Sequence, residues 1–282
     1  MALSNPLNKP RINNGICEFC GIPAEACPHY SMTIDKPSLM ARPVESQSPQ
    51  QLYRPRKFKT LNLFQEKMAD IVIPHYDRHD MLAKVLEHVM PDTYNIIVAS
   101  GGSFAQNCNR GALAAVTDKI IFLNDDTVPN EHLINAILRD LDQYDVVGCA
   151  QKVPSSTEIL YGVGFYYEGK KLKAKLVTAP GDVHFPSGFC VGIRRKVFEK
   201  FKFDEGFKNG GEDSDLFFRL KEAGHTIYVN PTVIIPHHHG QSEGRLAYTA
   251  ENSELLNRKW PQEKIEKLFG FSGESLKILL AT

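Results

Sequence analysis

The stretch at residues 119–129, KIIFLNDDTVP, constrains the fold of this chain more than any other. Its apolar residues 120–123 are typical of a short strand that is buried on both faces. The strand runs directly into Asn-Asp-Asp at 124–126, and open α/β sheets bind their ligands at the carboxyl edge. Carboxylates beside a diphosphate suit Mg²⁺ or Mn²⁺. The alternative is a polar turn that caps a helix beginning near Glu131.

The composition of the chain is that of a globular protein with one large core. It has 282 residues, of which 42% are hydrophobic and 23% charged. The formal net charge is zero, so no overall field indicates nucleic acid or a basic partner. The start of the chain lacks the apolar run of a signal peptide, and no run approaches the length of about 18 apolar residues needed for a membrane span. We therefore expect no transmembrane segment and a cytoplasmic location.

Residues 1–67 differ from the rest and form an expected N-terminal extension rich in Pro, Ser, Asn and Gln. Cys17 and Cys20 form a Cys-x-x-Cys-Gly turn, which presents two thiolates to one ion. Cys27 and His29 would complete a tetrahedral Cys₃His site with a structural Zn²⁺ that orders this short segment. A loop with reduced thiols is the alternative.

Segments with strand and helix patterns alternate from residue 69 onward. Strands alternating with helices at this spacing predict a doubly wound parallel sheet. Short strands and turns at 159–186 predict that the sheet becomes mixed. The expected strands lie at 70–74, 95–99, 120–123 and 145–148, and the expected helices begin near 80, 107 and 132.

Three carboxylates follow two glycines in residues 210–220, GGEDSDLFFRL. Glu212, Asp213 and Asp215 would lie in the first turn of a helix, where the helix macrodipole favours negative charge. Helix capping alone could explain them, but three carboxylates in four residues exceed what a cap needs. We therefore treat them as candidate site residues.

Three consecutive histidines follow the apolar run at 233–235. His237, His238 and His239 would lie at the end of a strand, and a neutral imidazole is a suitable metal ligand. The sequence does not decide which of the three binds an ion.

The order of these parts resembles family 2 glycosyltransferases of the GT-A fold. The resemblance covers about residues 69–260. It implies an α/β, Rossmann-like domain at 68–260, with a mixed central sheet and helices on both faces, followed by a C-terminal helical tail at 261–282. The motifs that carry it are Pro-His-Tyr at 74–76, Asn-Asp-Asp at 124–126, Phe-Asp-Glu at 203–205, Gly-Glu-Asp-Ser-Asp-Leu at 211–216, His-His-His-Gly-Gln-Ser at 237–242 and Asn-Arg-Lys-Trp at 257–260.

The resemblance also implies roles for individual residues. Asp126 would bind Mn²⁺ or Mg²⁺ on the donor diphosphate, and one of the histidines would add a ligand. Asp213 would be the catalytic base, with Glu212 beside it. We expect the donor to be bound by Pro74, Tyr76, Arg78, Ser100, Asn109, Asn124 and Asp125, and the acceptor by Gly188, Gly211 and Asp215.

The predicted function is a metal-dependent transfer of a hexosyl or pentosyl group from a nucleotide-diphosphate sugar to an acceptor hydroxyl, with inversion. Members typically carry an acidic residue after the second strand that grips the base, whereas residues 99–102 read Ala-Ser-Gly-Gly, which leaves the base open. The acceptor is also open: a saccharide, a lipid-linked saccharide, a protein or a modified nucleic acid. The alternatives are a nucleotidyltransferase of related fold and a non-catalytic, zinc-anchored binding module.

Overall fold

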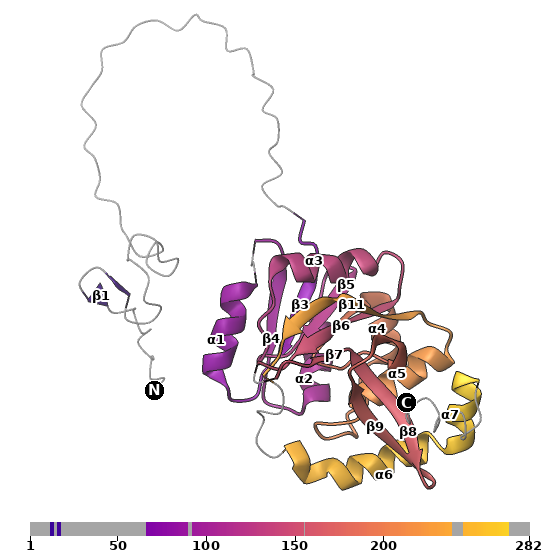
Figure 1. The fold of residues 1–282 in the computed structure, drawn as a ribbon. Helices are drawn as coiled ribbons and strands as arrows, with labels where there is room; N and C mark the ends of the chain where they lie inside the picture. The colour runs from indigo at the N-terminus through magenta and orange to yellow at the C-terminus, as the bar shows by residue number, and fades with distance from the viewer. Residues whose placement is uncertain are drawn as a thin grey trace, which may run out of the picture. The chain divides into compact units, whose positions relative to one another are not determined.

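The chain divides into two units, Met1–Thr60 and Leu61–Thr282. In the first unit, β1 (Ile12–Asn13) pairs antiparallel with β2 (Ile16–Cys17). The computed structural model describes, besides the backbone of these two strands, residues 66–89, 92–154, 156–238 and 245–270 (Figure 1). The side chains of the proposed zinc ligands Cys17, Cys20, Cys27 and His29 lie outside the described residues, so the zinc site stays a prediction.

A mixed sheet forms the centre of the second unit, as predicted. Its strand order is β11-β6-β10-β5-β3-β4, with β7 paired to β6. β3 is parallel to both β4 and β5, and β11 is parallel to β6, whereas β10 is antiparallel to both of its neighbours. The strands are β3 (Asp70–Pro74), β4 (Asn95–Ala99), β5 (Lys119–Leu123), β6 (Val146–Lys152), β7 (Ile159–Leu160), β10 (Cys190–Arg194) and β11 (Ile227–Pro236).

Helices cover both faces of this sheet (Figure 1). The alternation of side chains along β3 shows why: Ile71 and Ile73 belong to one apolar cluster and Val72 to the other. α1 and α3 pack in the first cluster, and the other helices pack in the second. The helices are α1 (His79–His88), α2 (Phe104–Leu113), α3 (Glu131–Asp140), α4 (Arg195–Phe201), α5 (Glu212–Glu222), α6 (Thr249–Lys259) and α7 (Gln262–Phe269).

Two further features complete the described part of this unit. β8 (Gly162–Glu168) and β9 (Lys171–Val177) form a separate antiparallel hairpin, which confirms the expectation of short strands there. The 3₁₀ turns are η2 (Pro180–Asp182) and η3 (Arg245–Tyr248). Among the described residues, no helix combines the length and the apolar character that a membrane crossing requires.

The start of α2 corrects one predicted boundary. We expected this helix to begin near Asn107, but it begins at Phe104. Ser103 accepts a hydrogen bond from the Gln106 backbone N–H, and the Gln106 side chain accepts one from the Ser103 N–H. This capping box satisfies two backbone donors of the first turn, so the helix starts earlier than its apolar periodicity suggests.

One edge of the sheet gathers the motifs that the sequence singled out. β3, β4, β5, β6 and β11 all end there, because these strands run in the same direction. β10 runs the other way and begins there, with Cys190 opposite Leu123. Residues 187–189 therefore lie beside residues 124–126, and the Asn124 N–H donates to the Phe189 carbonyl at 2.8 Å.

Candidate active site

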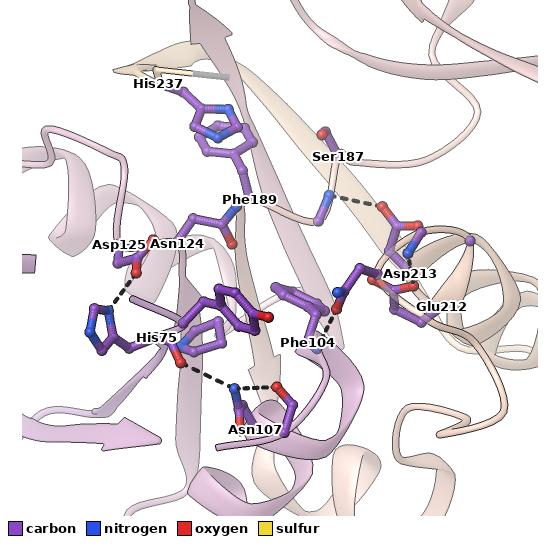
Figure 2. A pocket seen from close by; sticks show the side chains of 17 residues that line it. His75, Phe104, Asn107, Asn124, Asp125, Ser187, Phe189, Glu212, Asp213 and His237 are labelled. Atoms are coloured by element: carbon purple, nitrogen blue, oxygen red, sulfur yellow. Dashed lines mark hydrogen bonds and ion pairs between the residues drawn. The ribbon is translucent and has the colours of Figure 1, made fainter. Parts of the chain in front are cut away.

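A pocket of about 230 Å³ opens at this edge of the sheet (Figure 2). Six segments of the chain line it. They are the end of β3 with the loop after it, the start of α2 with the loop before it, the loop after β5, the loop before β10, the start of α5 with the loop before it, and the residue after β11. The pocket therefore forms where strand ends and helix starts converge, which is the usual ligand position in an open α/β sheet.

Asp125 is held by a histidine that the sequence analysis did not single out. Its Oδ2 lies 2.7 Å from His75 Nδ1, and His75 Nε2 lies 3.0 Å from His79 Nδ1. Burial raises the pKa of Asp125, and the nearby charge of Asp126 acts in the same direction, whereas the hydrogen bond with His75 opposes both effects. The three side chains form a chain of contacts from the pocket to the exposed start of α1.

Asp126 lies beside the first histidine of the run. Asp126 Oδ1 is 3.0 Å from His237 Nε2, and both side chains are buried. His237 Nδ1 lies 2.5 Å from Gln151 Oε1, and its ring stacks on Phe189 with the ring centroids 4.7 Å apart. With the Nδ1 proton donated to Gln151, the Nε2 lone pair faces the carboxylate oxygen. This arrangement is complementary to a cation.

The donor set fits a divalent ion that is shared with a substrate. Asp126 supplies one carboxylate and His237 one imidazole, and no group of three or more His, Cys, Asp or Glu side chains in the described part of the chain could hold a metal ion. Mg²⁺ is commonly bound by only one or two carboxylates together with substrate phosphates and waters. The second histidine, His238, donates its backbone N–H to the Asp126 carbonyl at 2.9 Å, and the third, His239, lies outside the described residues.

Asp213 and Glu212 lie on the other side of the pocket, in the first turn of α5 (Figure 2). Asp213 Oδ1 accepts the Ser214 N–H at 2.7 Å, and Oδ2 accepts the Gly188 N–H at 3.2 Å. Glu212 Oε2 accepts the Gly210 N–H at 2.6 Å. These backbone donors fix the orientation of both carboxylates at the start of the helix.

Two glycines allow this geometry. A Cβ atom at Gly188 would lie 2.9 Å from Asp213 Oδ2 and 3.0 Å from Asp213 Cβ, so only glycine lets the two segments approach this closely. Gly211, the residue before the helix, has φ +91°, a conformation that residues with a Cβ rarely adopt. Gly188 and Gly211 both line the pocket, and their role as acceptor contacts stays a prediction.

Six predicted site residues in the described part of the chain do not line the pocket. Two of them, Asp126 and His238, directly follow the lining residues Asp125 and His237, and the other four are Arg78, Ser100, Asn109 and Asp215. Arg78 lies at the start of α1 and pairs with Asp80 at 3.7 Å. The carbonyl of Ser100 accepts a hydrogen bond from Arg110. Asn109 donates to the Phe203 carbonyl and accepts the Phe203 N–H, both at 3.0 Å. These two hydrogen bonds anchor the loop before α5. The placement of these three residues does not support direct donor contacts.

Asp215, the fourth, requires a correction. Its side chain is fully buried, and its oxygens contact Trp260, Lys259 and Arg219. A carboxylate without exposed surface cannot contact an acceptor, so the predicted acceptor role of Asp215 is wrong. Its buried partners explain why an acidic residue stands there.

The pocket also contains polar residues that sequence reasoning missed. Asn107 is buried, and its Nδ2 donates to the carbonyls of His75, at 3.3 Å, and Gly102, at 3.1 Å. It thereby joins the loops that follow β3 and β4. Asn209 accepts the Phe104 N–H at 2.9 Å and has φ +55°. Asparagine adopts a positive φ more readily than most residues, but the sequence alone does not show which asparagine does so.

Comparison with protein families decides the class of this chain. Residues 70–253 match the family described as "Glycosyltransferase like family 2". The chain belongs to this family. The match begins at β3 and ends within α6, so it includes every residue that lines the pocket. The predicted resemblance to family 2 glycosyltransferases is confirmed. No curated protein matches the chain.

Solved structures similar to this chain match it over part of its length. The mannosyltransferase PcManGT from Pyrobaculum calidifontis, in complex with GDP-Man and Mn²⁺, is 12% identical, with a TM-score of 0.43 over 64% of this chain and 59% of its own. The catalytic domain of Drosophila β1,4-galactosyltransferase 7, in complex with xylobiose, is 20% identical, with a TM-score of 0.38 over 60% and 67%. S. aureus TarS is 12% identical, with a TM-score of 0.48 over 73% and 44%. The chain thus spans less than two thirds of the length of two of these structures.

Proposed function

We propose that this glycosyltransferase moves a hexosyl or pentosyl group from a nucleotide-diphosphate sugar to an acceptor hydroxyl, with inversion at the anomeric carbon. The observation that carries the proposal is the arrangement of two kinds of carboxylate around one pocket (Figure 2). Asp126, next to pocket-lining Asp125, faces an imidazole nitrogen at 3.0 Å, and Asp213 is oriented by backbone N–H groups. The surroundings of Asp126 suit the binding of a cation, and those of Asp213 suit a carboxylate that accepts a proton.

Asp126 and His237 would hold Mn²⁺ or Mg²⁺ in this proposal. When bound, the ion neutralises the charge that develops on the departing diphosphate. Gln151 fixes the orientation of the His237 ring through the contact at Nδ1, so that Nε2 points toward Asp126. The buried position of Asp126 and His237 excludes water on the protein side and strengthens their attraction for a cation.

Asp213 would act as the general base. It removes the proton of the acceptor hydroxyl while the acceptor oxygen forms a bond to the anomeric carbon and the bond from that carbon to the diphosphate oxygen breaks. Direct attack on the face opposite the diphosphate inverts the configuration. The hydrogen bonds from Gly188 and Ser214 hold the carboxylate in place for this step.

The nucleotide part of the donor would bind beside β3 and β5. Tyr76 is 63% exposed and lines the pocket, so its ring offers a face for stacking. Asn124 Oδ1 is buried and has no hydrogen-bond partner among the described residues. A ribose hydroxyl is the kind of donor that would satisfy this oxygen. Asp125 and Pro74 complete this side of the pocket.

The test is a panel of nucleotide sugars with and without Mn²⁺. The expected result is that one donor raises the melting temperature in the presence of Mn²⁺ and is turned over to the nucleoside diphosphate. Release of the sugar 1-phosphate, with transfer of the nucleotidyl group to added pyrophosphate, would instead identify a nucleotidyltransferase. Saccharides, lipid-linked saccharides, a protein and a modified nucleic acid then serve as acceptors, and the anomeric configuration of the product decides between inversion and retention. A panel in which no nucleotide sugar binds would contradict the proposal.

A further inference from the structure

Asp215 occupies a position that the proposed reaction does not use. It lies in the first turn of α5, two residues after Asp213, and its side chain is 0% exposed. A buried carboxylate costs free energy unless charged or hydrogen-bonded partners compensate for it. The contacts of Asp215 therefore indicate why the charge is retained.

Three partners surround the Asp215 carboxylate. Oδ1 accepts the Trp260 Nε1–H at 2.9 Å and lies 2.8 Å from Lys259 Nζ. Oδ2 accepts the Arg219 Nε–H at 2.8 Å. Lys259 and Trp260 lie at the end of α6, so Asp215 ties the first turn of α5 to a helix that contributes no residue to the pocket lining.

The start of α5 needs such an anchor. Its N-cap is Gly211, which has no side chain to cap the helix. Phe207 is the residue nearest to a Cβ atom at Gly211, so the segment before the helix is closely packed as well. The position of the first turn, and with it the positions of Glu212 and Asp213, is therefore fixed from the other side of the helix.

α6 also holds the loop that leads into α5. Asn252 accepts the Lys208 N–H at 3.0 Å and donates to the Lys208 carbonyl at 2.9 Å. Lys259 reaches back to Asp204, at 2.5 Å, while it contacts Asp215. The same helix thus fixes both the loop and the first turn that carries Asp213.

The ionic network is balanced. Asp204 and Asp215 supply two negative charges, and Arg219 and Lys259 supply two positive charges. Arg219 also donates to the carbonyls of Phe201 and Lys202, at 2.6 Å and 2.8 Å, which closes the network around the same loop. Loss of Asp215 alone would leave two partly buried cations with one carboxylate, that of Asp204, between them.

We propose that Asp215, through Trp260 and Lys259 of α6, is the positioning residue that holds Asp213 in register with Gly188 for proton transfer. This inference rests on the proposed function, in which Asp213 is the base. It makes the end of α6 part of the active-site support, although the helix lies outside the pocket.

The test compares Asp215→Ala with the double variant Asp215→Ala with Lys259→Met, which restores the charge balance. We expect the double variant to regain much of the melting temperature that the single variant loses. Both should keep a kcat about 10-fold or more below wild type, because a small displacement of a catalytic group has a large effect on rate. The KM for the donor should stay within about twofold of wild type, because the donor side of the pocket is unchanged.

Asp145→Ala is the matched control. Asp145 also accepts several hydrogen bonds, from His225 and Thr226, but it precedes β6 at the opposite edge of the sheet. This variant should lose stability and keep the wild-type kcat. A loss of kcat in the control equal to that of Asp215→Ala would overturn the inference, as would a kcat that recovers together with stability in the double variant.

Trp260→Phe keeps the test decisive if Asp215→Ala does not fold. It removes the Nε1 donor and retains an aromatic ring in the core, where the Trp260 side chain is buried. We expect a fall in kcat of a few-fold at unchanged donor KM, and an unchanged kcat would overturn the inference. Failure of the proposed function is a different result: the wild type would show no transfer, or Asp213→Asn would keep its turnover.

Discussion

Two pairs of carboxylates lie in or directly beside the pocket, and they are held in different ways. Asp125 and Asp126, at the end of β5, face imidazoles at 2.7 Å and 3.0 Å. Glu212 and Asp213, at the start of α5, accept hydrogen bonds from the backbone N–H groups of neighbouring loop and helix residues. The partners of the first pair are imidazole side chains, which can tolerate or bind an added cation. The partners of the second pair are neutral backbone donors in fixed positions.

This difference shows how one pocket can separate two kinds of chemistry. An imidazole nitrogen can hold a proton or a metal ion, so the surroundings of Asp126 respond to added positive charge. A backbone N–H can only donate, so it orients the Asp213 carboxylate and leaves it available to accept a proton. Variants of the two pairs should therefore fail in different ways.

Asp126→Ala should have the largest effect, namely the loss of metal-dependent donor binding. Removal of the carboxylate leaves only His237 on the protein side, while the fold should remain intact because Asp126 follows β5 at the pocket edge. Isothermal titration with a nucleotide sugar in the presence and absence of Mn²⁺ measures this. Unchanged transfer by the variant, or Mn²⁺ independence of the wild type, would remove the basis for the metal assignment.

Asp213→Asn should reduce turnover by ~10²-fold or more and leave donor affinity nearly unchanged, because it removes a base and not a ligand. Asparagine has only one acceptor oxygen, so it keeps the hydrogen bonds from Gly188 and Ser214 only in part. A small structural change is therefore expected as well. Steady-state kinetics measure both quantities. If donor binding is lost while turnover at saturation persists, the base lies elsewhere.

The sequence predicted both carboxylate pairs but not the side chains that surround the first pair. β3 at 70–74 and β4 at 95–99 match the predicted strands, and the Asn-Asp-Asp motif follows β5 as expected. The acidic residues were found because they lie at strand and helix ends, which local patterns locate. His75, the partner of Asp125, and Gln151, the partner of His237, were not found, because they lie 50 and 86 residues away in sequence from the residues they contact.

The error at Asp215 has a physical reason that the sequence already contained. Successive residues of an α-helix are rotated by about 100°, so Asp213 and Asp215 point roughly 200° apart. One side chain faces the pocket and the other faces the core, where it contacts Trp260. Reading the three carboxylates as one cluster ignored this rotation. The zinc prediction could not be compared, since its ligands lie outside the described residues.

Gly188→Ala should have a smaller effect than either carboxylate variant. The added Cβ would approach Asp213 Oδ2 to 2.9 Å, so the Asp213 side chain must shift. We expect kcat to fall by less than the ~10²-fold of Asp213→Asn, because the base is displaced but still present. Donor affinity should stay the same. A crystal structure of the variant with an unmoved Asp213, or a fall in donor affinity alone, would contradict this role of Gly188.

Asp145→Asn should leave activity unchanged, because Asp145 precedes β6 at the edge of the sheet opposite to the pocket. Burial alone would raise the pKa of Asp145, but hydrogen bonds from Thr226 and His225 outweigh burial and lower it. A carboxyl whose pKa is lower in the folded than in the unfolded chain stabilises the fold above the unfolded pKa, about 3.9, and this stabilisation is lost as the pH falls through the folded pKa. The variant should therefore melt below wild type at pH 7, and the two melting curves should converge in acid. Thermal unfolding monitored by circular dichroism from pH 7 downward measures the difference. A constant difference across this range would show that Asp145 acts through packing and not through its charge.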